Sequence, residues 1–145
     1  MEDETSEEVR ELMEYPENTV GSLMTTDYIS LNQNITVNET INELRKLKPE
    51  ADSIYYLYIV DEKETLIGIV SLRDLIISQP ETPLNKIMNT EVIHVYDHDK
   101  IDSLVQIITK YNLFAIPVAD KEEKLTGMVI IDDVVHNLLK SRRRV

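Results

Sequence analysis

The sequence predicts an α+β protein with two tandem βαββα repeats, each a small three-stranded sheet with helices on one side. The pattern of the chain repeats once, and each copy combines short apolar runs with an amphipathic helical pattern. The 145 residues are 42% apolar, which is enough to bury a core. The expected domains are an acidic N-terminal helix and linker (1–19), repeat 1 (20–79), repeat 2 (80–141) and a basic tail (142–145).

The repeat is clearest in two stretches. Residues 23–31 and 87–95 agree in their apolar and acidic positions, and further along the chain Gly68 matches Gly127. The spacing between matched positions is shorter in the second stretch. The first copy therefore has extra residues, which we place at 49–53, between its long helix and its central strand.

Local patterns predict the elements of each copy. Thr36 and Glu39 form a capping box before an amphipathic helix, and Ser71 caps a shorter helix with Asp74 in its first turn. Runs rich in β-branched and aromatic residues predict buried hairpins. The expected strands are 28–31, 54–60, 66–70, 115–119 and 125–130, and the expected helices are 5–14, 37–47, a short one after Ser71, 99–111 and one that runs to about 140.

Composition excludes several classes of protein. The absence of cysteine excludes disulfides and thiolate ligands and fits a reducing compartment, so we expect a cytoplasmic protein. The longest apolar runs are far shorter than the roughly 20 residues of a membrane-spanning helix. The net charge of −12 argues against nucleic-acid binding, which depends on Lys and Arg.

Three motifs resemble the cystathionine-β-synthase (CBS) domain family, whose members usually occur as tandem pairs. They are Leu-Met-Thr-Thr at 23–26, Gly-Ile-Val-Ser-Leu-Arg-Asp at 68–74 and Ile-Pro-Val at 116–118. Residues 15–26 and 54–58 further resemble MgtE-type magnesium transporters. That resemblance implies a cytosolic regulatory region, at the cytosolic face of an inner-membrane transporter, whose partner is the membrane domain of a magnesium channel. It also implies that residues 1–19 are the end of a preceding domain.

The resemblance to CBS pairs implies an adenine nucleotide, such as ATP, in the cleft between the copies. Asp74 would hold the ribose hydroxyls, with Ser71 and Arg73 near phosphate, because a carboxylate accepts two vicinal O–H bonds and a helix N-terminus suits an anion. Tyr56 would stack on the base. The opposing apolar wall would comprise Leu113, Phe114 and Pro117. The alternative is that Ser71 and Asp74 only cap a helix.

The second copy departs from this motif. Ile130 replaces the Ser or Thr, although Asp133 remains, so a phosphate contact is missing there. We therefore expect at most one good nucleotide site. Because Tyr55, Tyr56 and Tyr58 alternate faces of a strand, at least one of them is expected to be core.

Magnesium is the second implied ligand. The resemblance implies that Mg²⁺ bridges acidic residues, for which Asp102, Asp132 and Asp133 are candidates, since Mg²⁺ prefers carboxylates plus retained waters. The alternative is that these side chains are solvated helix caps. His136 is far in sequence from His94 and His98, so the three histidines do not share a close spacing, and no Gly-rich phosphate loop is present; neither a zinc site nor an enzyme is expected.

The expected function is a non-catalytic sensor that gates a magnesium transporter in response to Mg²⁺, an adenine nucleotide or both. One alternative is a soluble adenylate-sensing adaptor of an unrelated partner, and another, without a supporting motif, is a nucleotide-hydrolysing enzyme. A homodimer is expected through residues 75–77 and 134–135. These positions could instead complete each repeat's core.

Overall fold

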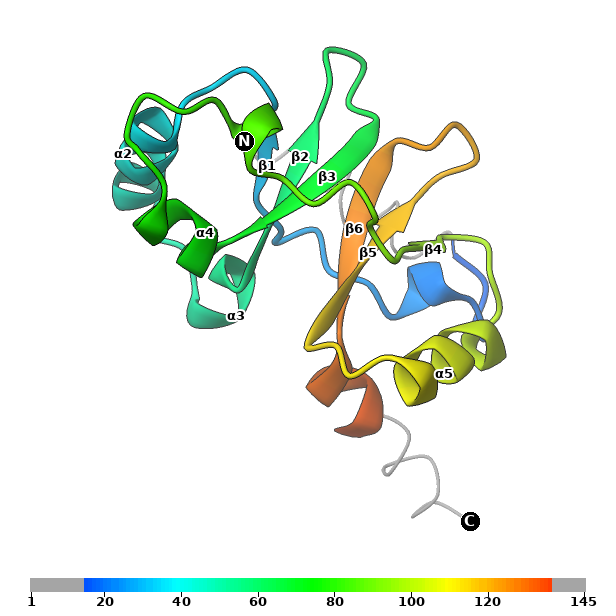
Figure 1. Cartoon of the computed structure of the whole chain (residues 1–145). Helices are drawn as coiled ribbons and strands as arrows, with labels where there is room; N and C mark the ends of the chain where they lie inside the picture. The colour runs from blue at the N-terminus through cyan, green and yellow to red at the C-terminus, as the bar shows by residue number, and fades with distance from the viewer. Residues whose placement is uncertain (1–14, 137–145) are drawn as a thin grey trace, which may run out of the picture. The chain divides into compact units, whose positions relative to one another are not determined.

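The computed structural model describes residues 15–136, which form two compact units (Figure 1). The copy-one unit comprises residues 27–93 and 122–125. The copy-two unit comprises residues 15–26, 94–121 and 126–136. The predicted helix at 5–14 and the basic tail lie outside the described residues. No helix of residues 15–136 is long and apolar enough to cross a membrane.

The copy-one unit contains a mixed three-stranded sheet in the order β1-β2-β3. Strand β1 pairs parallel with β2, and β2 pairs antiparallel with β3, which is the pairing of a βαββ unit. Its elements are β1 (Ser30–Asn32), α2 (Val37–Leu47), α3 (Ala51–Ile54), β2 (Tyr56–Val60), β3 (Leu66–Ser71), α4 (Leu72–Ile77) and the 3₁₀ helix η2 (Leu84–Lys86).

The copy-two unit repeats this order with β4-β5-β6. Val95 of β4 pairs with Val118 of β5 as Leu31 pairs with Ile59 in copy one, so the register agrees with the sequence repeat. Its elements are the 3₁₀ helix η1 (Val20–Ser22), β4 (Val95–Tyr96), α5 (Ile101–Lys110), β5 (Ala115–Ala119) and β6 (Leu125–Ile130), followed by helix at 131–136. The predicted α+β fold of two βαββα repeats is confirmed.

One face of each sheet carries the core. In the copy-one unit, Leu57, Ile59 and Val70 pack against apolar residues of α2 and α4. In the copy-two unit, the corresponding core consists of Val20, Met24, Val95, Leu104, Ile116, Val118, Val129 and Val134. Thr36 and Ser71 cap the helices α2 and α4, as predicted, and each forms a complete capping box.

Two predicted strands begin later in the structure than expected, whereas the helix expected over 99–111 (α5, Ile101–Lys110) and the strand expected over 66–70 (β3, Leu66–Ser71) differ by only one or two residues at their ends. The strand expected over 54–60 begins only at Tyr56, because the extra residues of copy one form helix α3 and draw Ile54 into it. The strand expected over 28–31 is β1, and it starts at Ser30. Both differences arise because an apolar run has the same composition in a buried strand as in a short buried helix or loop.

The repeated motif around each methionine packs in the unit that holds the other copy's strands. Met24 lies against Gly127 of β6, and Thr25 exchanges two backbone hydrogen bonds with Met128. Met88 lies against Gly68 of β3 in the same manner. Each unit is therefore completed by a segment that belongs, in sequence, to the start of the other copy.

Candidate functional site

The copy-one sheet brings Tyr56, Ser71 and Asp74 to one end. Tyr56 begins β2, Ser71 ends β3, and their antiparallel register makes them direct partners. Helix α4 starts immediately after Ser71 and carries exposed Arg73 and half-buried Asp74 in its first turn. The four polar residues predicted for this unit thus lie along the same edge.

Ser71 and Asp74 form a capping box. The Ser71 amide donates to Asp74 Oδ2 at 3.1 Å, and the Asp74 amide donates to Ser71 Oγ at 3.2 Å. Among the described residues, none donates to Asp74 Oδ1 and none accepts the Ser71 hydroxyl hydrogen. Ser71 and Asp74 therefore do cap helix α4. The cap leaves Asp74 Oδ1 and the Ser71 hydroxyl hydrogen for a ligand.

The three neighbouring tyrosines have different environments. Tyr55 is exposed, Tyr56 is half-buried and Tyr58 is fully buried, with its ring edge-on to Tyr28 at 6.5 Å between centroids. The Tyr58 hydroxyl has no hydrogen-bond partner in the described part of the chain. Burial, with a smaller contribution from Tyr56, strongly raises the pKa of Tyr58. Tyr58 is the core tyrosine that the alternating pattern led us to expect.

The remaining predicted nucleotide contacts belong to the copy-two unit. Leu113 and Phe114 are half-buried between α5 and β5, and the Phe114 carbonyl accepts the Ile131 amide at 3.0 Å. Pro117 is buried in the middle of β5. At the position of Ser71, β6 ends in Ile130, whose side chain has no oxygen to cap the helix at 131–136.

The predicted magnesium ligands do not form a cage in the described chain. Asp102 is exposed in the first turn of α5, and Asp132 and Asp133 are exposed in the helix at 131–136. No three acidic or histidine side chains within residues 15–136 are grouped as a metal site. These residues alone do not fit a dedicated Mg²⁺ site, although exposed carboxylates suit a hydrated ion.

A pocket that the sequence did not predict lies at the same end of the copy-one sheet. Its volume is about 330 Å³, and part of its wall is made by the extra residues of copy one. The Ser53 hydroxyl, which donates to the Asp27 carbonyl at 2.8 Å, ties that wall to the start of β1. The lining residues are Asp27, Tyr28, Ile29, Leu47, Lys48, Pro49, Glu50 and Ser53.

Comparison with known families decides the identity of the two repeats. The sequence profile of the CBS domain matches residues 20–81 and again residues 84–140. The chain belongs to the CBS domain family. As a CBS pair it is 40% identical over 131 residues to the magnesium transporter MgtE of Thermus thermophilus, which covers 90% of this chain and 29% of that relative.

Solved structures resemble this CBS pair closely. The cytosolic domain of the Mg²⁺ channel MgtE, crystallised with ATP, has 39% identity and a TM-score of 0.87, over 92% of this chain and 54% of that one. The soluble part of a magnesium transporter has 35% identity and a TM-score of 0.89, over 97% of this chain and 55% of that one. The chain is a regulatory CBS module that spans under a third of the length of its MgtE relative.

Proposed function

We propose that this CBS pair is a non-catalytic, cytosolic module that binds an adenine nucleotide and regulates a magnesium transporter. The observation that carries the proposal is the edge formed by Tyr56, Ser71 and Asp74, where the capping box leaves Asp74 Oδ1 and the Ser71 hydroxyl hydrogen unused. The similarity to an MgtE cytosolic domain crystallised with ATP supports the nucleotide and the transporter.

Each residue of the edge has a role that suits its chemistry. Asp74 Oδ1 accepts a ribose hydroxyl while Oδ2 keeps the helix cap, and Ser71 donates its hydroxyl to a phosphate oxygen. Exposed Arg73 pairs with phosphate, for which its planar guanidinium is well suited. Tyr56 stacks on the base. The apolar contacts to the nucleotide remain a prediction; their residues are Leu113, Phe114 and Pro117.

Regulation follows if the nucleotide binds one state of the transporter better than another. A ligand shifts such an equilibrium only by its differential affinity, so the bound nucleotide must favour one arrangement of the module. Mg²⁺ is proposed as a second effector, through Asp102, Asp132 and Asp133 together with acidic groups of a neighbouring segment, because these three form no cage within residues 15–136.

The proposal is tested by calorimetric titration of ATP into the full chain, with and without Mg²⁺. We expect saturable binding near one site per chain, and loss of that binding in Asp74→Asn. Asparagine keeps an oxygen for the Ser71 amide but lacks the second acceptor, so the cap survives while the ribose contact does not. In the titration without Mg²⁺, the matched control is Asp133→Asn, at the equivalent position in copy two. Absence of binding in the wild type, or equal binding in Asp74→Asn, would overturn the nucleotide site.

We also propose a homodimer through the exposed apolar residues of the short helices. Leu75 and Val134 are buried within their own units, whereas Ile76, Ile77 and Val135 are 78%, 63% and 46% exposed. Two of the five predicted contact residues therefore complete the core, and the other three are left for a second copy. Sedimentation analysis should show a dimer for the wild type and a monomer for Ile76→Glu with Ile77→Glu. A wild-type monomer at all concentrations would exclude this contact.

A further inference from the structure

The segment that starts at Tyr15 is fastened to the copy-two unit, although in sequence it leads into copy one. We call residues 15–26 the entry strap. Two of its side chains are buried in the copy-two core: Val20, near the end of the first half (15–21), and Met24, in the second half (22–26). Its first half is held by polar contacts to the turn that follows β4, residues 97–100.

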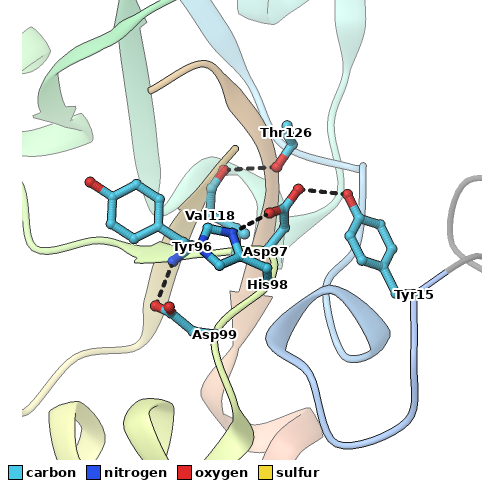
Figure 2. Close-up of polar contacts among 7 residues, drawn as sticks. All are labelled: Tyr15, Tyr96, Asp97, His98, Asp99, Val118 and Thr126. Carbon is cyan, nitrogen blue, oxygen red and sulfur yellow. Dashed lines mark hydrogen bonds and ion pairs between the residues drawn. The ribbon is translucent and has the colours of Figure 1, made fainter. Parts of the chain in front are cut away.

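Asp97 is the centre of these polar contacts, as Figure 2 shows. The Tyr15 hydroxyl donates to Asp97 Oδ2 at 2.8 Å, and the Gly21 amide donates to the Asp97 carbonyl at 2.9 Å. The Asp97 amide in turn donates to Ala119 at the end of β5, at 2.9 Å. Asp97 therefore joins both ends of the first half of the strap to the copy-two sheet.

The strap is shaped for this contact. The ring of Tyr15 lies so close to Gly21 that a side chain there would collide with it, since an added Cβ would lie 2.2 Å from Tyr15 Cδ1. The backbone of the strap is also bonded outside Asp97: Val20 donates to the Asp99 carbonyl at 2.8 Å, and Ile101 donates to the Asn18 carbonyl at 3.2 Å. The hydrogen bond from the Tyr15 hydroxyl to Asp97 adds a contact at the first residue of the strap.

His98 completes the network at its solvent side. Its Nδ1 lies 3.2 Å from Asp97 Oδ1, a contact that becomes an ion pair when the imidazole is protonated. The Asp97 side chain is only 13% exposed, whereas that of His98 is 51% exposed. The Tyr15 contact is thus the better protected of the two, and charge-assisted hydrogen bonds of this kind are the strong ones.

We propose that Asp97 and Tyr15 form a latch that controls opening of the first half of the entry strap, so that this segment, which in sequence leads into copy one, is coupled to the copy-two unit. Release of the latch lets the backbone of residues 15–21 open, while the buried Met24 side chain keeps residues 22–26 in the core until a larger opening occurs. The sequence order alone would have assigned this coupling to copy one.

Hydrogen exchange of the full chain tests the latch. In Tyr15→Phe and in Asp97→Ala, exchange of the Val20 and Gly21 amides should accelerate about tenfold, the size expected for loss of one hydrogen bond to a charged group. The double variant should accelerate no more than the faster single variant, because both substitutions remove the same contact. His98→Ala should change the same amides by about twofold or less, as expected for a half-exposed pair.

The matched control is Tyr28→Phe, which removes a tyrosine hydroxyl that donates to the Leu125 carbonyl in the copy-one unit. It should leave the Val20 and Gly21 amides unchanged. Unchanged exchange at these amides in Tyr15→Phe would overturn the latch. Equal acceleration of the Tyr58 and Ile69 amides of the copy-one unit would overturn the assignment of the coupling to copy two.

Discussion

The two CBS copies share a backbone plan and differ in the chemistry at the end of their sheets. Copy one ends β3 in Ser71, which forms a capping box with Asp74, and its extra residues line a pocket at the same edge. Copy two ends β6 in Ile130, and Asp133 is left as an exposed carboxylate without a capping partner at that position. The duplicated fold thus keeps the same core pattern in both copies, whereas the polar edge with Ser71 and Asp74 is present only in copy one of the described chain.

The largest expected effect concerns the glycines on which the repeated methionines pack. In Gly127→Ala the new Cβ would meet Met24 Sδ at 2.5 Å and the Thr25 carbonyl oxygen at 3.1 Å, and the backbone oxygen cannot move aside. We expect a loss of about 3 kcal/mol in the free energy of unfolding by urea denaturation, at the upper end for an overpacked site. In Gly68→Ala the three nearest atoms, at 2.5, 2.9 and 3.0 Å, all belong to the Met88 side chain and none to the backbone, so we expect a smaller loss of about 2 kcal/mol. Equal losses would mean that the two contacts are equivalent.

Alkaline pH should reveal Tyr58, the one fully buried tyrosine among residues 15–136, which lies in copy one. Burial raises the pKa of Tyr58, so above pH 10 the unfolded chain loses a proton that the folded chain keeps. The unfolded state then binds fewer protons, and stability falls by up to about 1.4 kcal/mol per pH unit, whereas below pH 9 this group contributes no pH dependence. Urea denaturation at pH 9 and pH 11 should show a smaller decline for Tyr58→Phe than for the wild type. Parallel declines would contradict the buried, neutral phenol.

Substitutions at the helix caps should change the free energy of unfolding by different but smaller amounts in the two copies. Ser71→Ala removes the acceptor for the Asp74 amide and should lower the free energy of unfolding by about 1 kcal/mol. Asp133→Ala in copy two should change it by only a few tenths of a kcal/mol, as for other exposed surface positions. Chemical denaturation of both variants provides the comparison. A similar loss in Asp133→Ala would show that copy two has a cap of equal strength.

The hairpin turns are the feature in which the copies should behave alike. Glu64 and Glu123 occupy equivalent turn positions, with φ of 65° and 68°. These values lie in the left-handed region of the backbone, which is unfavourable for most residues other than Gly and Asn. Glu64→Asn and Glu123→Asn should each raise the free energy of unfolding by about 0.5 kcal/mol. Thermal unfolding should therefore shift upward by a similar amount in both variants, and opposite shifts would show that the turns are not equivalent.

Much of this architecture could be predicted because its signals are local. The capping boxes at Thr36 and Ser71 depend on two residues three positions apart, and the repeat fixes the order of the elements. Helix α3 was missed because Ile54 continues an apolar run that suits a strand equally well. The alternation of Tyr55, Tyr56 and Tyr58 along a strand predicts that at least one of them lies in the core, but it does not identify Tyr58 as that residue.

Contacts between distant segments could not be predicted from one sequence. Nothing in the repeat indicates that Met24 packs on Gly127 or that Tyr15 reaches Asp97, because these pairs depend on which segment completes which sheet. The pocket beside Ser53 was missed for the same reason. The repeat indicates extra residues at 49–53, but their number alone does not show that they form the wall of a pocket.

The most direct test of the difference between the copies is an ATP titration followed by backbone amide resonances in nuclear magnetic resonance spectra. The Ser71 and Asp74 amides take part in the cap that we propose to share its side chains with the nucleotide. We expect saturable shifts of these two resonances and no comparable shifts at Ile130 and Asp133. Equal shifts in both pairs, or shifts confined to Ile130 and Asp133, would contradict a single nucleotide site in copy one.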